Sequence, residues 1–386
     1  MTLAWLHDLD PVVVRLGGSF AIYWYGISYI LGFVLAYLVL RWLRTRGATP
    51  LDAPALGDMV VWGGLGGVIG GRVGYVLLYR PDLLADVSSS VPFWGAINIT
   101  KGGMASHGGF LGAMLGFLLL QRSLAKRARL DDRPELAVPR THLFDLAAFA
   151  APIGLLCGRL ANFVNGELLG RVAAPFGTPA PWWAVKYPQE VTARWDELSD
   201  DQRIAAAEAV GMSPLELRVE GGWDRFGQAW RALVAQMRDG DPAARNLLEA
   251  SLNARHPSQL YQALAEGVVV LAVLAIVWAR PRASGVISCW FVITYGVGRV
   301  ATEFFRLPDA HFQNQTPLGL SRGQWLSVAL IAIGVAGLAL IKARGRPDAP
   351  RFGGWLSKRG AKGSRIAAAA EVANGDRQSA ADTDQS

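Results

Sequence analysis

The sequence predicts an all-α protein that crosses a membrane about seven times and carries one large polar insertion. Apolar residues make up 52% of the 386 residues, whereas charged residues make up only 18%. The apolar residues gather in runs of roughly 20, the length that a helix needs to cross a bilayer. Basic residues alternate between the loops that separate these runs, as they do in polytopic membrane proteins.

The first two apolar runs cover residues 21–40 and 59–78. No basic segment precedes the first run, so we expect it to act as an uncleaved insertion signal. Tyr25 lies near its start, where aromatic residues often anchor a helix at the membrane interface. The second run carries glycines on two stripes whose spacing predicts close helix packing. These glycines are Gly63, Gly67 and Gly71 on one stripe, and Gly66, Gly70 and Gly74 on the other.

The third and fourth runs, residues 104–120 and 143–160, are short or are interrupted by glycines and Pro152. Counts of six or eight spans therefore stay open. The third run begins around His107, within the segment Gly-Gly-Met-Ala-Ser-His-Gly-Gly. A single histidine in such a place is structural more often than functional.

The fourth run ends in the segment GRLANFVNGELLG, residues 158–170. Ionisable groups at membrane depth are costly and are usually functional. This segment is therefore the first candidate for a site. Its polar side chains are Arg159, Asn162, Asn165 and Glu167.

The last three runs cover residues 260–279, 286–305 and 325–341. The sixth run contains Arg299 and Glu303, which are four residues apart and so share one face of a helix. They could pair with each other as a purely structural contact, or they could belong to a site. Tyr295 lies on the same stripe.

Two segments interrupt or follow this helical pattern. Residues 171–255 form a long polar insertion between the fourth and fifth runs, which we call the head insertion. Residues 346–386 contain too few apolar side chains to fold, so we expect a disordered tail after a membrane domain of residues 1–345. The two cysteines, Cys157 and Cys289, lie in apolar runs, which favours neither a disulfide nor a metal site.

The basic residues predict the orientation. Lysines and arginines beside short loops stay in the cytoplasm, and here they follow the odd-numbered runs. We therefore expect the N-terminus and the head insertion outside, and the C-terminus in the cytoplasm. The net charge of +7 then reflects topology, and we expect no nucleic-acid partner. The loops after odd-numbered runs contain Arg41, Arg44 and Arg46; Arg122, Lys126, Arg127 and Arg129; Arg280 and Arg282; and Lys342, Arg344 and Arg346.

Residues 158–170 resemble, at every defined position, the signature of the bacterial prolipoprotein diacylglyceryl transferases. The segment around His107 is similar to a second motif of that family, Gly-Gly-Met-x-x-His-Gly-Gly. The sixth run resembles a third motif, Tyr-Gly-x-x-Arg-x-x-x-Glu-Phe-x-Arg, and Pro308-Asp309-Ala310 continues the likeness. Trp24-Tyr25-Gly26 resembles the family more weakly. His256 to Tyr261 also look like the family, but Gln262 stands where an acidic residue is expected.

The resemblance implies a multi-pass enzyme of the bacterial cytoplasmic (inner) membrane, with its active site towards the outer face. Such an enzyme moves the diacylglyceryl group of phosphatidylglycerol onto the lipobox cysteine of a prelipoprotein signal peptide. A thioether forms, glycerol 1-phosphate leaves, and lipoprotein maturation begins. No cofactor or metal is implied.

The chemistry of that reaction suits the polar residues. Arginine binds phosphate with two parallel hydrogen bonds, so we assign the lipid phosphate to Arg159 and Arg299. We expect Glu167 and Glu303 to orient these arginines and to balance their charge.

The resemblance makes His107 an essential residue, and two roles stay open for it. A histidine with a pKa near ~6.5 could take the proton of a thiol with a pKa near ~8.5. Alternatively, His107 binds the lipid phosphate, and solvent or a tyrosine assists deprotonation. The remaining residues expected to bind substrate are Tyr25, Asn162, Asn165, Gly170 and Tyr295.

Two other classes of membrane protein compete with this interpretation. A transporter or lipid scramblase would use intramembrane Arg, Glu and His along a path, and paired broken helices in inverted repeats would favour it. The sequence contains no such pairing. A scaffold built on glycine-rich helices would leave Arg159, Glu167 and Arg299 unexplained.

Overall fold

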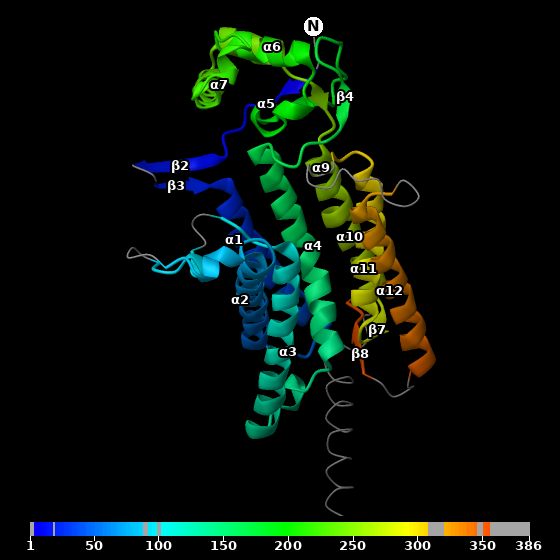
Figure 1. Cartoon of the computed structure of the whole chain (residues 1–386). Coiled ribbons are helices and arrows are strands. Elements are labelled where there is room, and N and C mark those ends of the chain that lie inside the picture. Colours follow the sequence, from blue (N-terminus) through cyan, green and yellow to red (C-terminus); the bar gives the residue numbers. More distant parts are fainter. Residues whose placement is uncertain are drawn as a thin grey trace, which may run out of the picture. The chain divides into compact units, whose positions relative to one another are not determined.

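The computed structural model of the chain describes residues 4–17, 20–87, 92–98, 102–307, 320–345 and 350–355, in two compact units. Unit 1 comprises Met1–Gly32, Ile153–Val270 and Thr294–Ile331. Unit 2 comprises Phe33–Pro152, Leu271–Ile293 and Ala332–Ser386. Most of the described residues lie in helices, which confirms the prediction of a mainly helical protein (Figure 1).

Six of the described helices are long and apolar enough to cross a membrane, and each overlaps a predicted run. The protein is therefore a multi-pass membrane protein. The six are α1 (Trp24–Thr45), α2 (Ala53–Leu78), α3 (Ser106–Leu130), α4 (Arg140–Asn165), a composite helix of α9 (Ser258–Gln262), the π-helical segment η7 (Ala263–Val269) and α10 (Val270–Trp278), and α12 (Arg322–Arg344).

The other predicted span corresponds to α11 (Val286–Glu303), an 18-residue helix that is not among these six. Arg299, Thr302 and Glu303 make its last turns polar. Pro152 does not interrupt the fourth span, because α4 continues through it. The short length expected for the third span is also wrong, since α3 has 25 residues.

Within unit 2, helices α2 and α3 pack closely along their glycines. Asp52 caps the first turn of α2 by accepting a hydrogen bond from the backbone N–H of Ala55 at 2.8 Å. A side chain at Gly70 would collide with the carbonyl of Gly108 on α3. The glycine spacing therefore serves helix packing, as predicted. The described residues of this part of the chain also include the short 3₁₀ helices η1 (Pro81–Leu84), η2 (Gly95–Ile97) and η4 (Pro134–Leu136).

Part of the predicted tail is ordered in unit 2. Strand β8 (Arg351–Gly353) pairs antiparallel with β7 (Pro281–Ala283). Phe352 stacks on the ring of His142 with the ring centroids 3.7 Å apart. The expectation of disorder from residue 346 is therefore wrong for this strand, because Phe352 makes an apolar contact although the residues around it are mostly polar. Residues 356–386 lie outside the described residues.

The head insertion belongs to unit 1 and has its own apolar core. Phe226 and Trp230 of one helix pack there with Val191 and Leu248, all of them buried. Its elements are β4 (Val172–Ala174), β5 (Val185–Lys186), α5 (Gln189–Ala193), η5 (Trp195–Glu197), α6 (Asp200–Ala209), η6 (Glu216–Arg218), α7 (Gly222–Arg238), α8 (Pro242–Glu249) and β6 (Ala254–Arg255).

The N-terminal segment joins the head insertion through a small sheet. Strand β1 (Trp5–Leu6) pairs parallel with β5, and the strand order is β1-β5-β6-β4. A separate two-stranded antiparallel sheet of β2 (Val12–Gly17) and β3 (Phe20–Tyr23) leads directly into α1. The fold is therefore mainly α with short strands, which the apolar runs alone did not predict.

Candidate functional site

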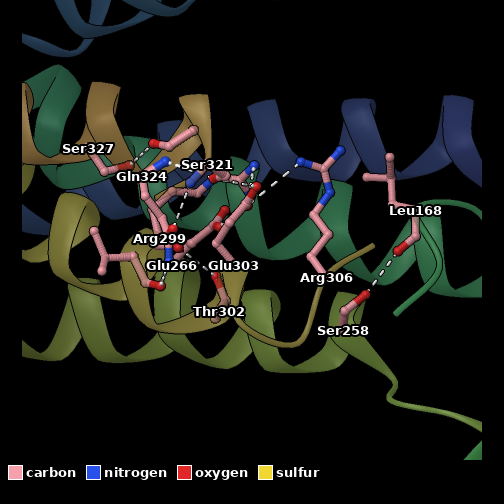
Figure 2. Close-up of polar contacts among 12 residues, drawn as sticks. Leu168, Ser258, Glu266, Arg299, Thr302, Glu303, Arg306, Ser321, Gln324 and Ser327 are labelled. Atoms are coloured by element: carbon pink, nitrogen blue, oxygen red, sulfur yellow. Dashed lines mark hydrogen bonds and ion pairs between the residues drawn. The ribbon is translucent and has the colours of Figure 1, made fainter. Parts of the chain in front are cut away.

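Two arginines share one buried carboxylate in unit 1. Arg159 of α4 donates from Nε and Nη2 to Oε2 of Glu266, at 3.1 and 3.0 Å. Arg299 of α11 donates from Nη1 to Oε1 of the same carboxylate at 3.3 Å. Glu266 is completely buried, while the two arginine side chains keep 17% and 15% of their surface exposed. One carboxylate therefore holds two partly exposed guanidinium groups. Figure 2 shows Glu266 beside one of them, that of Arg299.

Glu266 was not among the residues chosen from the sequence. It lies in η7, and π-helical turns are rare and often occur at functional sites. Gln262, where an acidic residue was expected, is buried four residues earlier, and its amide makes no hydrogen bond to the described residues. The signal that could have found Glu266 is a carboxylate inside an apolar run, which indicates function by default.

A second carboxylate, that of Glu303, extends the network. Its Oε2 lies 3.4 Å from Nη2 of Arg299 and 3.8 Å from Nη1 of Arg306. Its Oε1 accepts a hydrogen bond from the Oγ of Ser321 at 3.1 Å. Figure 2 shows Glu303 between these partners. The pairing of Arg299 with Glu303, which the spacing of four residues allows, is therefore present.

The polar residues of the signature segment make a turn after α4. The backbone N–H of Glu167 donates to the carbonyl of Asn162 at 3.0 Å. The side-chain amide of Asn165 donates to Oε1 of Glu167 at 3.1 Å, whereas its buried Oδ1 has no partner among the described residues. Glu167 is exposed and pairs with Asn165, whereas Glu266 pairs with the arginines; the orienting role of Glu167 stays a prediction.

Two tyrosines lie near this network. Tyr25 at the start of α1 is within electrostatic range of Arg159 and Glu167, and its hydroxyl accepts a hydrogen bond from Tyr29 at 3.3 Å. Tyr295 of α11 is within electrostatic range of Glu266, Arg299 and Arg159. Both tyrosines are therefore close enough to the arginines to interact with them electrostatically, and their role in substrate binding stays a prediction.

The end of the signature segment is joined to the end of α11 by backbone hydrogen bonds. Gly170 forms an antiparallel bridge with Arg306, and the N–H of Leu307 donates to the carbonyl of Leu169 at 3.1 Å. A side chain at Gly170 would collide with the carbonyl of His256. Close backbone packing thus explains the glycine, and its role in substrate binding stays a prediction.

His107 belongs to unit 2. It is exposed in the first turn of α3. The glycines after it pack against α2: a side chain at Gly108 would collide with the backbone of Gly70. The glycines around His107 therefore serve the helix interface, and whether the histidine acts as base or as lipid ligand stays a prediction.

The loop before His107 is held by a buried arginine that the sequence analysis passed over. Arg72 of α2 donates to the backbone carbonyls of Gly95 and Ala96, both at 2.7 Å. It also donates to those of Gly102 and Gly103, at 2.8 and 3.0 Å. All three nitrogens of this guanidinium thus bind backbone.

Two histidines lie beside the signature segment. Nε2 of His7, just after β1, hydrogen-bonds the carbonyl of Phe163 at 2.7 Å, and burial lowers the pKa of His7 below its usual range. His256 stacks on Trp183 with the ring centroids 4.8 Å apart, and burial lowers its pKa as well.

Two further expectations concern metals and the third motif. Among the described residues, no group of three or more His, Cys, Asp or Glu side chains could hold a metal ion. The arginines of the site instead suit an anionic ligand. Pro308-Asp309-Ala310, which continued the third motif, lies outside the described residues.

The family model and the individual relatives that match this chain carry the same name. A family model described as prolipoprotein diacylglyceryl transferase matches residues 11–340. Proteins named phosphatidylglycerol–prolipoprotein diacylglyceryl transferase are similar over nearly their whole length. The one from Bdellovibrio bacteriovorus is 37% identical over 361 residues, covering 91% of this chain and 97% of the relative. Those from Chromobacterium violaceum and Neisseria gonorrhoeae are 35% and 34% identical, covering 87% and 86% of this chain and 97% and 95% of the relatives. The chain therefore belongs to the prolipoprotein diacylglyceryl transferase family.

Proposed function

We propose that this chain transfers the diacylglyceryl group of phosphatidylglycerol to the cysteine thiol of a prolipoprotein, the first step of lipoprotein maturation. Family membership supports the reaction. One structural observation carries the assignment of the site: Arg159 and Arg299 divide the single carboxylate of Glu266 between them. With Arg306 and Glu303 the cluster of described residues holds three arginines and two carboxylates, so its excess positive charge attracts a further anion, and the phosphodiester of phosphatidylglycerol is one.

The hydrogen bonds leave donors available for that phosphate. Arg159 uses Nε and Nη2 on Glu266, and its Nη1 makes no hydrogen bond to the described residues. Arginine can present parallel N–H groups to two phosphate oxygens. In this proposal Glu266 keeps both guanidiniums at the site while the lipid is absent, because an unpaired charge at membrane depth is costly.

The reaction is a displacement at carbon. The cysteine sulfur attacks the glyceryl carbon that bears the phosphate, a C–S bond forms, and the C–O bond to the phosphate breaks. The bonding electrons leave with the oxygen of glycerol 1-phosphate. Its growing negative charge is stabilised by Arg159 and Arg299, since fixed charges aimed at a leaving group lower the barrier. The thiol proton passes to His107, or to solvent if His107 binds the lipid instead.

The neighbouring polar groups fit the headgroup. The glycerol hydroxyls of phosphatidylglycerol are hydrogen-bond donors, and the buried Oδ1 of Asn165 is an acceptor without a partner among the described residues. Asn162, Glu167 and Tyr25 complete the proposed headgroup site from one side. Tyr295 and Glu303 complete it from α11, and Gly170 allows the close backbone approach that shapes it.

The proposed topology has seven spans, with α11 as the additional one. The N-terminus and the head insertion lie outside, and the C-terminus lies in the cytoplasm of a bacterium whose inner membrane contains the enzyme. The alternation of basic loops supports this orientation. It also places the site where a secreted prolipoprotein, still anchored by its signal peptide, can reach it.

A reconstituted assay tests the function. The purified protein in lipid nanodiscs receives a lipobox peptide and either phosphatidylglycerol or phosphatidylethanolamine. Mass spectrometry then follows the diacylglyceryl peptide and the released glycerol phosphate. We expect product only with phosphatidylglycerol, and full activity after chelation of metals. Equal product with phosphatidylethanolamine, or a peptide of unchanged mass, would contradict the proposal.

A further inference from the structure

The signature segment contains a backbone turn that a non-glycine residue rarely adopts. Gly166 has a φ of 67° and Leu168 a φ of 54°, both in the left-handed region. Glycine tolerates this region, whereas a side chain such as leucine raises the energy by roughly 1–2 kcal/mol. Among the described residues of unit 1, Leu168 is the only non-glycine residue with positive φ. Such a conformation persists only where neighbouring groups hold it.

Three side chains next to the head insertion hold the carbonyls of this turn. Ser258 donates from Oγ to the carbonyl of Leu168 at 2.9 Å, as Figure 2 shows. The amide of Gln259 donates to the carbonyl of Glu167. Arg255 donates from Nη1 to the carbonyl of Gly170 at 3.0 Å. All three donors lie on the short segment that leads from β6 into α9.

The interior of the head insertion fixes two of these donors. The hydroxyl of Tyr187 donates to Oε1 of Gln259 at 3.2 Å, so the amide nitrogen faces the turn. Arg255 pairs through Nε with Oε2 of Glu190 at 2.7 Å, and this carboxylate is completely buried. Its other oxygen accepts a hydrogen bond from Gln202 of α6 at 2.9 Å. A chain of buried polar groups thus connects α6 to the signature turn.

From these contacts we propose that Ser258, Gln259 and Arg255 are positioning residues for the signature turn, and that the interior of the head insertion holds Gln259 and Arg255 in place. They fix the backbone from Gly166 to Gly170, which aims Asn165 and Glu167 and keeps the bridge to Arg306 in register. Without them fewer hydrogen bonds oppose the strain of Leu168, so its backbone relaxes more readily out of the left-handed region. This inference rests on the proposed function for its effect on turnover, but not for its effect on the backbone.

The test combines Ser258→Ala with Leu168→Gly. Ser258→Ala removes the one side-chain hydrogen bond to the carbonyl of Leu168 itself, so we expect a fall in kcat of about tenfold, a size typical of a misplaced reacting group. Glycine at position 168 adopts the left-handed conformation without strain. The double variant should therefore have a kcat within about threefold of Leu168→Gly alone, which is a measurable coupling between the two sites.

Ser251→Ala is the matched control. Ser251 is buried and donates from Oγ to the carbonyl of Leu247 at 2.6 Å, so the variant removes the same kind of bond from the head interior. It should lower thermal stability to a similar extent and leave kcat near wild type. A general loss of stability, by contrast, would lower the activity of both serine variants and would not be reversed by glycine at position 168.

Hydrogen exchange separates this inference from the proposed function. In Ser258→Ala, the backbone amides of residues 166–170 should exchange faster than in wild type, whatever reaction the protein catalyses. Unchanged exchange there would overturn the inference, as would a double variant as slow as Ser258→Ala. If instead the wild-type protein forms no thioether, the proposed function fails while the exchange result still decides the positioning role. Gln259→Leu provides a second variant if Ser258→Ala does not fold.

Discussion

Buried arginines occur in both units, and their partners differ. In unit 2, Arg72 donates to four backbone carbonyls from all three of its nitrogens. In unit 1, Arg159 and Arg299 share the carboxylate of Glu266, and both keep part of their surface exposed. Arg72 spends its hydrogen bonds on four neutral carbonyls and so holds a loop. The shared carboxylate of Glu266 uses only some of the arginine donors, and we propose that others bind the ligand. The identity of the partners, more than burial, separates the site from the scaffold.

Glu266→Gln should have the largest effect. The substitution keeps the shape of the side chain but leaves two guanidiniums without their common counter-ion. Removing one partner of a buried pair costs roughly 3–5 kcal/mol, so we expect a loss of stability of that order and no measurable turnover. Thermal unfolding and the nanodisc assay measure both. Glu249→Gln is the control, because it breaks a partly exposed pair with Arg245 and should cost at most about 1 kcal/mol. If Glu266→Gln were as stable as wild type, Glu266 would not be the counter-ion on which the two arginines of unit 1 depend, and the contrast with Arg72 would fail.

Arg159→Lys and Arg299→Lys should have the second-largest effect, a loss of activity without a loss of stability. Each keeps the positive charge beside Glu266, so the protein should fold and insert normally. Lysine lacks the planar fork that binds phosphate through two hydrogen bonds. We expect kcat/KM to fall by about a hundredfold, which corresponds to about 2.7 kcal/mol of transition-state stabilisation. Near-normal turnover of both variants at wild-type protein levels would identify the arginines as helix-pairing charges.

Arg72→Lys should have the opposite effects: it should lower stability and leave lipid binding unchanged. An ammonium has three donors, so at least one of the four carbonyls loses its partner, at a cost of about 1–3 kcal/mol. We expect a lower unfolding temperature, whereas the affinity for phosphatidylglycerol should stay unchanged. Circular dichroism on heating measures the first quantity and lipid titration the second. A loss of lipid affinity without a loss of stability would place Arg72 in the site.

The smallest effect is a pH dependence at the N-terminal border of the signature segment. Burial lowers the pKa of His7, with a contribution from the charge of Arg238, so the unfolded chain binds a proton more readily than the folded one. The stability that neutral His7 contributes is complete above pH ~6.5 and falls as the pH drops below it, by at most about 1.4 kcal/mol per pH unit. His256, whose pKa burial also lowers, adds a contribution of the same sign. Unfolding temperatures between pH 5 and 8 should vary less in His7→Gln and least in His7→Gln/His256→Gln. An unchanged slope in the double variant would show that neither histidine is responsible.

The apolar runs predicted the positions of the six long apolar helices, and the polar residues within them pointed to Arg159, Arg299 and Glu303 of the candidate site. Apolar runs identify helices because membrane length sets their size. The spacing of Arg299 and Glu303 correctly suggested a pair, which the structure forms at 3.4 Å. Arg159 was identified from its position at the end of a run.

Other features depend on contacts between distant segments. Glu266 pairs with Arg159, 107 residues away, and local spacing does not reveal such a partner. The resemblance predicted an acidic residue at position 262, where Gln262 stands, and gave no indication of Glu266. The strained Leu168 is invisible in the sequence, because only its neighbours make that conformation stable. Strand β8 was missed because one aromatic residue, Phe352, lies in a polar segment.

Lipid affinity tests the central claim most directly. Phosphatidylglycerol is titrated into wild type, Arg159→Lys, Arg299→Lys and Arg72→Lys in nanodiscs of neutral lipid, and bound lipid is counted by native mass spectrometry. If the two arginines of unit 1 bind the phosphate, their lysine variants should bind phosphatidylglycerol at least tenfold more weakly, a difference of about 1.4 kcal/mol. Arg72→Lys should bind it like wild type. Wild-type affinity in Arg159→Lys and Arg299→Lys, or an equal loss in all three variants, would contradict the account.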